Sequence, residues 1–106
     1  MRARNRCLKE IIDILEIDSK NQEIIKNDFF TIRYLYFDAG KGLTTQHENA
    51  MAAVQVIEGR ITFVHGKDEN ACSMQGGTTL EFDARETYSI IAHENSKILI
   101  TIVPIK

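Results

Sequence analysis

The sequence is poor in cysteine and contains neither a long apolar run nor an excess of positive charge. Its 106 residues include two cysteines, Cys7 and Cys72, which form neither a CxxC pair nor a disulfide framework. We therefore expect both thiols to stay reduced, as in the cytoplasm. No window approaches the roughly 18 to 20 consecutive apolar residues that cross a bilayer. Lys9, Glu10 and Asp13 interrupt any signal-peptide core.

The charge balance and length limit the class of protein further. A formal net charge of −2 offers no basic field for nucleic acid. The 43% apolar and 26% charged content is ordinary for a soluble globular protein, and a chain of this length forms a single core. We therefore expect one cytoplasmic domain that has neither a nucleic acid nor a membrane as its partner.

The N-terminal part of the chain predicts a short helix. Apolar residues recur there at i, i+3, i+4 and i+7 with charged residues between them, a pattern typical of an amphipathic helix; they are Leu8, Ile11, Ile12 and Leu15. We assign residues 1–22 to this helix and its lead-in, and residues 23–106 to the folded domain. The helix is expected to lie on the outside of the domain or to reach a partner.

Short β-strands separated by turns are predicted for the rest of the chain. Gly59 is expected to supply the positive φ of a tight hairpin turn, and residues 76–77 mark another turn. Several short, evenly spaced strands favour a sandwich or barrel and an all-β fold. The predicted strands cover residues 23–26, 29–37, 52–57, 61–65, 78–82, 88–92 and 98–103.

Two of these strands are apolar on both faces. In the first, Leu35 and Phe37 share a face with Arg33, and the opposite face carries Phe30, Ile32, Tyr34 and Tyr36. The strand over residues 98–103 is apolar on both sides as well. Since one interior cannot cover both faces, we expect a homodimer whose outward faces pack across a twofold axis.

Two segments resemble the conserved motifs of the cupin family. Residues 40–59 read GKGLTTQHENAMAAVQVIEG, ending in a segment similar to the cupin hairpin, and residues 77–88 read GTTLEFDARETY. This resemblance to a small single-domain cupin implies a double-stranded β-helix, or jelly-roll barrel, and it also favours pairing into dimers. In that family, two histidines, a glutamate and a third histidine hold a metal at one mouth of the barrel.

This sequence departs from the first cupin motif at the ligand positions. Counting back from the last glycine puts Ala52 where the family has its glutamate. The histidine pair falls on different residues when counted from the two ends of the motif, and both registers stay open. The pair is either Gln46 and Glu48 or Thr45 and His47.

The second motif has lost its histidine too. Asp83, Arg85 and Tyr88 stand where the family has proline, glycine and histidine. A catalytic metal site needs about three convergent protein ligands, so we expect no cofactor and no stoichiometric metal. If a divalent transition metal does bind, the weak candidate ligands are His47 and Glu48, although neighbouring residues of a strand face opposite sides.

Four residues are candidates for a ligand-binding pocket in such a barrel: Arg33, Gln46, His47 and Tyr88. Arg33 either faces an anionic ligand or lies at the rim, paired with a carboxylate such as Glu81 or Glu86. Tyr88 either contacts ligand or fills the volume of the lost metal ligand, with its hydroxyl hydrogen-bonded. The remaining histidines, His65 and His93, are expected to be solvated loop residues.

Three classes of function stay open, because the fold alone cannot choose among them. The first is a non-enzymatic module that binds a small organic molecule. The second, implied by the cupin resemblance, is a metal-dependent oxygenase, isomerase or decarboxylase with atypical ligands. The third is a structural or regulatory protein that acts as a dimer. We favour the first, because the metal ligands are missing.

Overall fold

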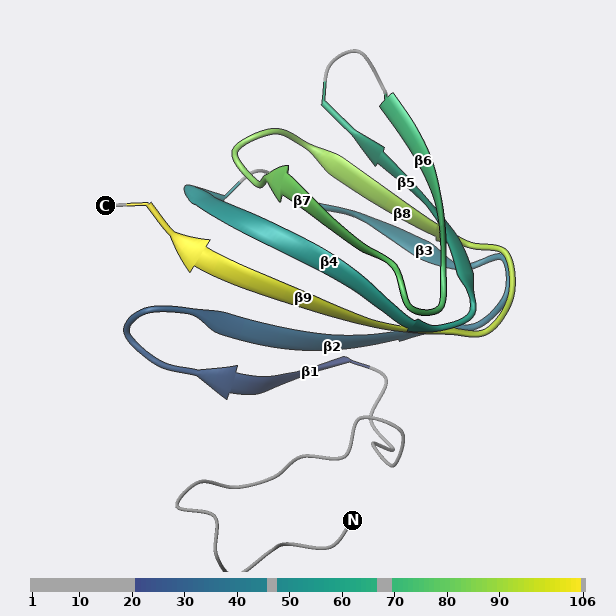
Figure 1. Ribbon diagram of the computed structural model, residues 1–106, viewed down its shortest axis with the longest axis horizontal. Helices are drawn as coiled ribbons and strands as arrows, with labels where there is room; N and C mark the ends of the chain where they lie inside the picture. Colours follow the sequence, from purple (N-terminus) through teal and green to yellow (C-terminus); the bar gives the residue numbers. More distant parts are fainter. Residues whose placement is uncertain (1–20, 46–47, 67–69, 106) are drawn as a thin grey trace, which may run out of the picture.

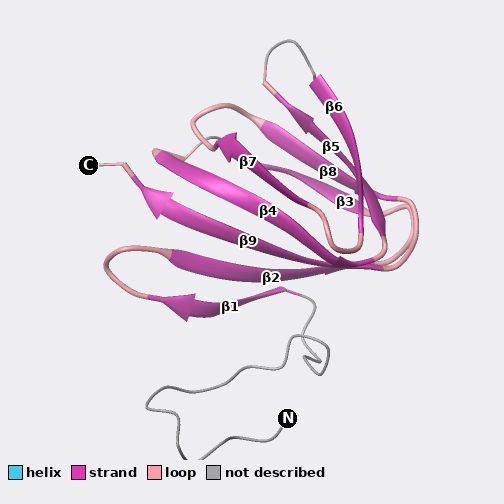
Figure 2. Cartoon of the chain, in the orientation of Figure 1, coloured by secondary structure: helices cyan, strands magenta, loops and turns pink. Residues whose placement is uncertain are grey.

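The protein is described by a computed structural model that covers residues 21–45, 48–66 and 70–105. The predicted helix around residues 8–15 lies outside this part. Within it the chain forms strands and no helix (Figures 1 and 2), so no described helix could span a membrane. The strands are β1 (Asn21–Lys26), β2 (Thr31–Phe37), β3 (Gly42–Thr45), β4 (Ala50–Glu58), β5 (Arg60–His65), β6 (Asn70–Gln75), β7 (Thr79–Asp83), β8 (Tyr88–Ala92) and β9 (Ser96–Pro104).

These strands form two antiparallel sheets. One has the strand order β1-β2-β9-β4-β7 and the other the order β3-β8-β5-β6. The sheets converge where β4 turns into β5 and β8 into β9, and they diverge at the opposite end, on the left in Figure 1. We call that second end the open end of the barrel. The architecture is the all-β jelly roll that the sequence predicts.

Strand β2 begins two residues later than the sequence predicts. The side-chain oxygen of Asn27 accepts hydrogen bonds from the backbone N–H groups of Phe29 (2.8 Å) and Phe30 (3.0 Å). This local turn holds the chain out of the ladder until Thr31, as asparagine side chains commonly do. Phe29 therefore projects outward and is 69% exposed.

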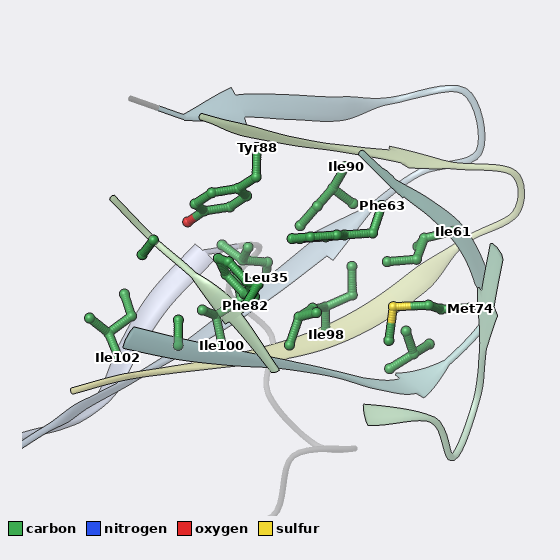
Figure 3. Packing of buried hydrophobic residues seen from close by; sticks show 14 of the residues in the cluster. Leu35, Ile61, Phe63, Met74, Phe82, Tyr88, Ile90, Ile98, Ile100 and Ile102 are labelled. Carbon is green, nitrogen blue, oxygen red and sulfur yellow. The ribbon is translucent and has the colours of Figure 1, made fainter. Parts of the chain in front are cut away.

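The core lies between the two sheets (Figure 3). Alternate residues of each strand enter it, as the period of two requires: Leu35 and Phe37 come from β2, and β9 contributes every second residue. Burial of each large aliphatic side chain stabilises the fold by about 1.5–3 kcal/mol. The β9 contribution consists of Ile98, Ile100 and Ile102.

The outward sides of β2 and β9 carry apolar side chains as well, as the sequence predicts. Tyr34 is only 1% exposed there, although it does not belong to the inward cluster. Burial raises the pKa of its hydroxyl, and the nearby Tyr36 and Glu58 raise it further. On the same sheet, Ile25 (38%) and Val103 (47%) stay exposed. The outward face is thus partly covered within a single chain.

Candidate ligand-binding site at the open end of the barrel

The two segments that resemble cupin motifs meet at the open end. The backbone N–H of Glu48 donates to the carbonyl of Ala84 (2.7 Å), whose own N–H donates to the carbonyl of Ala50 (3.0 Å). In the second sheet, Tyr88 of β8 is the register partner of His65 at the end of β5. Antiparallel pairing therefore collects residues from both motifs around one end of the core.

An aromatic cluster fills the interior next to this end. The Tyr88 ring stacks on Phe63, with 5.6 Å between ring centroids and 22° between planes, and meets the edge of Phe82 at 4.7 Å. His65 adds a fourth ring, 5.7 Å from Phe82. Contacts of this kind contribute about 0.5–1.5 kcal/mol beyond area burial. Tyr88 thus fills volume inside the barrel, which is one of the two roles predicted for it.

The hydroxyl of Tyr88 is buried and has no hydrogen-bond partner among the described residues. The residue is 2% exposed, and Figure 3 shows the hydroxyl oxygen pointing away from Ile90 and Phe63, toward the side where Ile102 lies. No residue in the described ranges forms a hydrogen bond with it, so the expected hydrogen bond within the chain is absent there. Leaving a buried hydroxyl unsatisfied costs about 1–3 kcal/mol.

Arg33 lies at the rim and is already paired. Its Nη1 is 3.1 Å from Oε1 of Glu48, its Nη2 is 3.5 Å from Oε2, and its Nε is 3.6 Å from Glu23 on the adjacent strand β1. The rim alternative of the prediction is correct, but the partners are not Glu81 or Glu86. Glu81 is exposed on β7, and the nearest ionic partner of Glu86 is a histidine.

A second arginine–carboxylate pair lies at the end of β7. The guanidinium of Arg85 contacts Asp83 through Nη2 (2.7 Å) and Nε (2.9 Å), and the Arg85 backbone N–H donates to the same carboxylate (2.9 Å). These hydrogen bonds from Arg85 lower the pKa of Asp83 to about 2. His65 Nε2 lies 2.9 Å from the Asp83 carbonyl oxygen and 3.8 Å from the Glu86 carboxylate.

His65 ends a strand as predicted, but its side chain is not a solvated loop residue; the prediction for His93 is confirmed. His65 is half-buried and lies within β5 among aromatic rings, because it continues the inward series that begins with Ile61 and Phe63. That period of two was the signal that could have identified it. His93 is exposed in the turn after β8, where its Nε2 lies 2.6 Å from the Thr62 hydroxyl oxygen.

The predicted pocket residues fall into two groups. Arg33 and Tyr88 both lie near the open end, one in the rim and the other in the wall. Gln46 and His47 lie outside the described residues, and so the choice between the two registers of the first motif is not resolved.

The described ligand positions do not fit the metal site of a cupin. Ala52, at the glutamate position, is buried in the core and has no donor atom. Tyr88, at the histidine position, packs among aromatic rings. In residues 21–45, 48–66 and 70–105, no group of three or more histidine, cysteine, aspartate or glutamate residues is placed to hold a metal ion.

A shallow groove of about 380 Å³ runs elsewhere, along β3 and β8, and is lined by residues 40–44 and 89–91. None of the predicted site residues borders it. The groove and the open end of the barrel are therefore separate features.

Several solved structures share this fold. An RmlC-like cupin from Desulfovibrio desulfuricans is 23% identical, with 99% of each chain covered and a TM-score of 0.72. TT1209 from Thermus thermophilus is 12% identical over 91% of this chain and 98% of its own, with a TM-score of 0.80. The Cupin_2 domain of an XRE family transcriptional regulator from Enterobacter cloacae is 12% identical over 81% of this chain and 96% of that one, with a TM-score of 0.72.

No protein-family model matches the sequence, and neither does any curated protein sequence. The structural likeness therefore establishes the fold and leaves the activity open. The structural likeness extends over most of the barrel and agrees with the two segments that resemble cupin motifs. At the described positions, however, the metal ligands of cupins are replaced by other residues. This chain has the fold of a small cupin.

Proposed function

We propose that this barrel is a non-enzymatic module that binds a small organic molecule at its open end, without a transition metal, in the cytoplasm. The observation that carries the proposal is the Tyr88 hydroxyl, which is buried and has no hydrogen-bond partner among the described residues. Buried polar groups in folded proteins nearly always have a partner. A bound ligand would supply one.

The surroundings of Tyr88 support a small ligand with an apolar body. Phe82 and Phe63 form the aromatic part of the wall, and Ala50 and Ala84, both buried, contribute only methyl groups. Few polar groups at the edge of an apolar surface are typical of small-molecule sites. A bound molecule would therefore pack on carbon and be oriented by the Tyr88 hydroxyl.

A fragment titration followed by amide NMR tests the proposal. Binding is expected to shift amide signals at the open end, including those of His65, Ala84 and Tyr88, and to leave Glu94 at the far turn unchanged. Tyr88→Phe should keep the fold and weaken binding about 2- to 10-fold, because one hydrogen bond contributes about 0.5–1.5 kcal/mol.

Two results would contradict the proposal. Shifts confined to residues 40–44 and 89–91 would assign binding to the groove along β3 and β8 instead. About one equivalent of iron, manganese, nickel or zinc per purified chain would favour the alternative, a metal-dependent oxygenase, isomerase or decarboxylase with ligands from residues such as His47 and Glu48. Elemental analysis of protein prepared without chelators decides this point.

A regulatory use of the bound molecule is the second candidate. The observation that favours it is the likeness to the cupin domain of a transcriptional regulator. Ligand binding would then alter contacts with another protein domain, since the net charge of −2 gives this chain little attraction for nucleic acid. A ligand-dependent change in a co-purified protein partner would support this role.

A further inference from the structure

We infer that the open end of the barrel selects small organic cations over anions, an inference that rests on the proposed function and specifies its ligand. The reason is the charge balance of the rim. Its two guanidinium groups, Arg33 and Arg85, are both engaged by carboxylates. A ligand entering between them meets no unpaired guanidinium from this described set.

Carboxylates outnumber guanidinium groups in this set. Glu23 and Glu48 both contact the guanidinium of Arg33, at 3.6 and 3.1 Å. Asp83 pairs with Arg85, and Glu86 lies 3.8 Å from the imidazole of His65. Lys26 lies 3.9 Å from Glu23 and adds a third positive charge, so three cationic side chains and four carboxylates leave a formal charge of −1 when the histidine is neutral.

Part of this negative charge, that of the Glu48 carboxylate, lies beside the candidate site. Glu48 lies in the hydrogen-bonded junction of residues 48–50 with Ala84 at the open end. Asp83 alternates with Phe82 and Ala84, which face the core, so its side chain points to the outward face of the sheet. The Glu48 side chain is 36% exposed, so its charge is only partly screened by water. The Tyr88 hydroxyl can accept a hydrogen bond from an ammonium group as readily as it can donate one.

An anion would have to displace an existing partner of Arg33 or Arg85. The Asp83–Arg85 pair is closed by two side-chain hydrogen bonds of 2.7 and 2.9 Å and a third from the backbone. Charge-assisted bonds of this type are about twice as strong as neutral ones. Arg33, which the sequence offered as an anion receptor, is likewise engaged by Glu48 and Glu23.

A set of three probes with one shape and different charges tests the inference. Tyramine is cationic, 4-hydroxyphenethyl alcohol is neutral and 4-hydroxyphenylacetate is anionic. Their dissociation constants would be measured by NMR titration of the full chain at low ionic strength. Tyramine is expected to bind about tenfold more tightly than the anion, as one charge interaction near a protein surface predicts. Added salt should reduce this ratio of the two dissociation constants.

Two variants separate charge from hydrogen bonding. Glu48→Gln should reduce the preference for tyramine severalfold, while Glu94→Gln, at the opposite end of the barrel, should leave it unchanged. Tyr88→Phe should weaken all three probes alike and keep their ratio. Equal binding of the three probes, or preference for the anion, would overturn the inference while leaving the proposed function intact. No binding of any probe at millimolar concentration would overturn both.

Discussion

Replacement of Gly59 by alanine should destabilise the protein more than an ordinary turn substitution. Gly59 joins β4 to β5 with φ of +97°, a backbone conformation that L residues rarely adopt. A Cβ built there would lie 2.5 Å from the carbonyl oxygen of Asn95 and 2.7 Å from Cα of Ser96, and closer still to the Ser96 hydroxyl. Two of these atoms belong to the backbone, so a rotamer change cannot relieve the contact.

The expected magnitude has two parts. The left-handed backbone conformation costs about 1–2 kcal/mol for a residue with a Cβ. Forcing an extra methyl group against a packed neighbour typically costs about 1–3 kcal/mol more. Gly77→Ala is the matched control, because Gly77 has φ of +94° and nothing within 4 Å of an added Cβ. It should show the first cost without the second.

Urea unfolding followed by far-ultraviolet circular dichroism measures both variants, since the chain has no tryptophan to report by fluorescence. Gly59→Ala should lose about 2–5 kcal/mol of unfolding free energy, and Gly77→Ala about 1–2 kcal/mol. Equal losses would refute the argument that the turn after β8 packs against Gly59. A loss near zero in both would refute the positive φ values themselves.

Three other predictions concern pH, assembly and metal content. The folded pKa of Asp83 is about 2, below the usual value of about 3.9. Its contribution to stability is therefore complete above about pH 4 and is lost as the pH falls toward 2. Asp83→Asn should be less stable than wild type at pH 5, and this difference in stability should disappear near pH 2. Light scattering during size exclusion should give a mass near twice 12.1 kDa. Val103→Glu on the outward face should lower this mass. Tyr34→Glu should instead unfold the chain, because Tyr34 is already buried within one copy. Elemental analysis should find well under one transition metal per chain, and one equivalent lost in His47→Ala would contradict this.

Strand identity could be predicted from the sequence because it depends on local pattern. The alternation over residues 98–103 and the turn at Gly59 both specify their structure directly, and β8 has the predicted bounds of Tyr88–Ala92. Strands β3 and β6 were missed, since GLTT has only four residues and NACSMQ contains no β-branched or aromatic residue. Their pairing with β8 and β5 supplies what their own composition does not.

The site was less predictable because it depends on contacts between distant segments. The position of Tyr88 in the second motif identified it as a wall residue. Whether its hydroxyl finds a partner within the described ranges depends on what surrounds it in three dimensions. The partners of Arg33 illustrate the same limit: Glu48 is 15 residues away in the sequence, and only the return of the chain into β4 brings the two together. Counting along motifs cannot supply such pairs.

The position of β9 has a consequence for how the chain folds. This strand follows all the other described strands in the sequence, yet it lies between β2 and β4 in the five-stranded sheet. Until residues 96–104 have left the ribosome, β2 and β4 have no shared neighbour, and their unpaired edges and apolar faces stay open to other chains. Such late, long-range pairing makes folding slow and aggregation-prone during synthesis. The five-stranded sheet is therefore completed only after the last described strand has been synthesised.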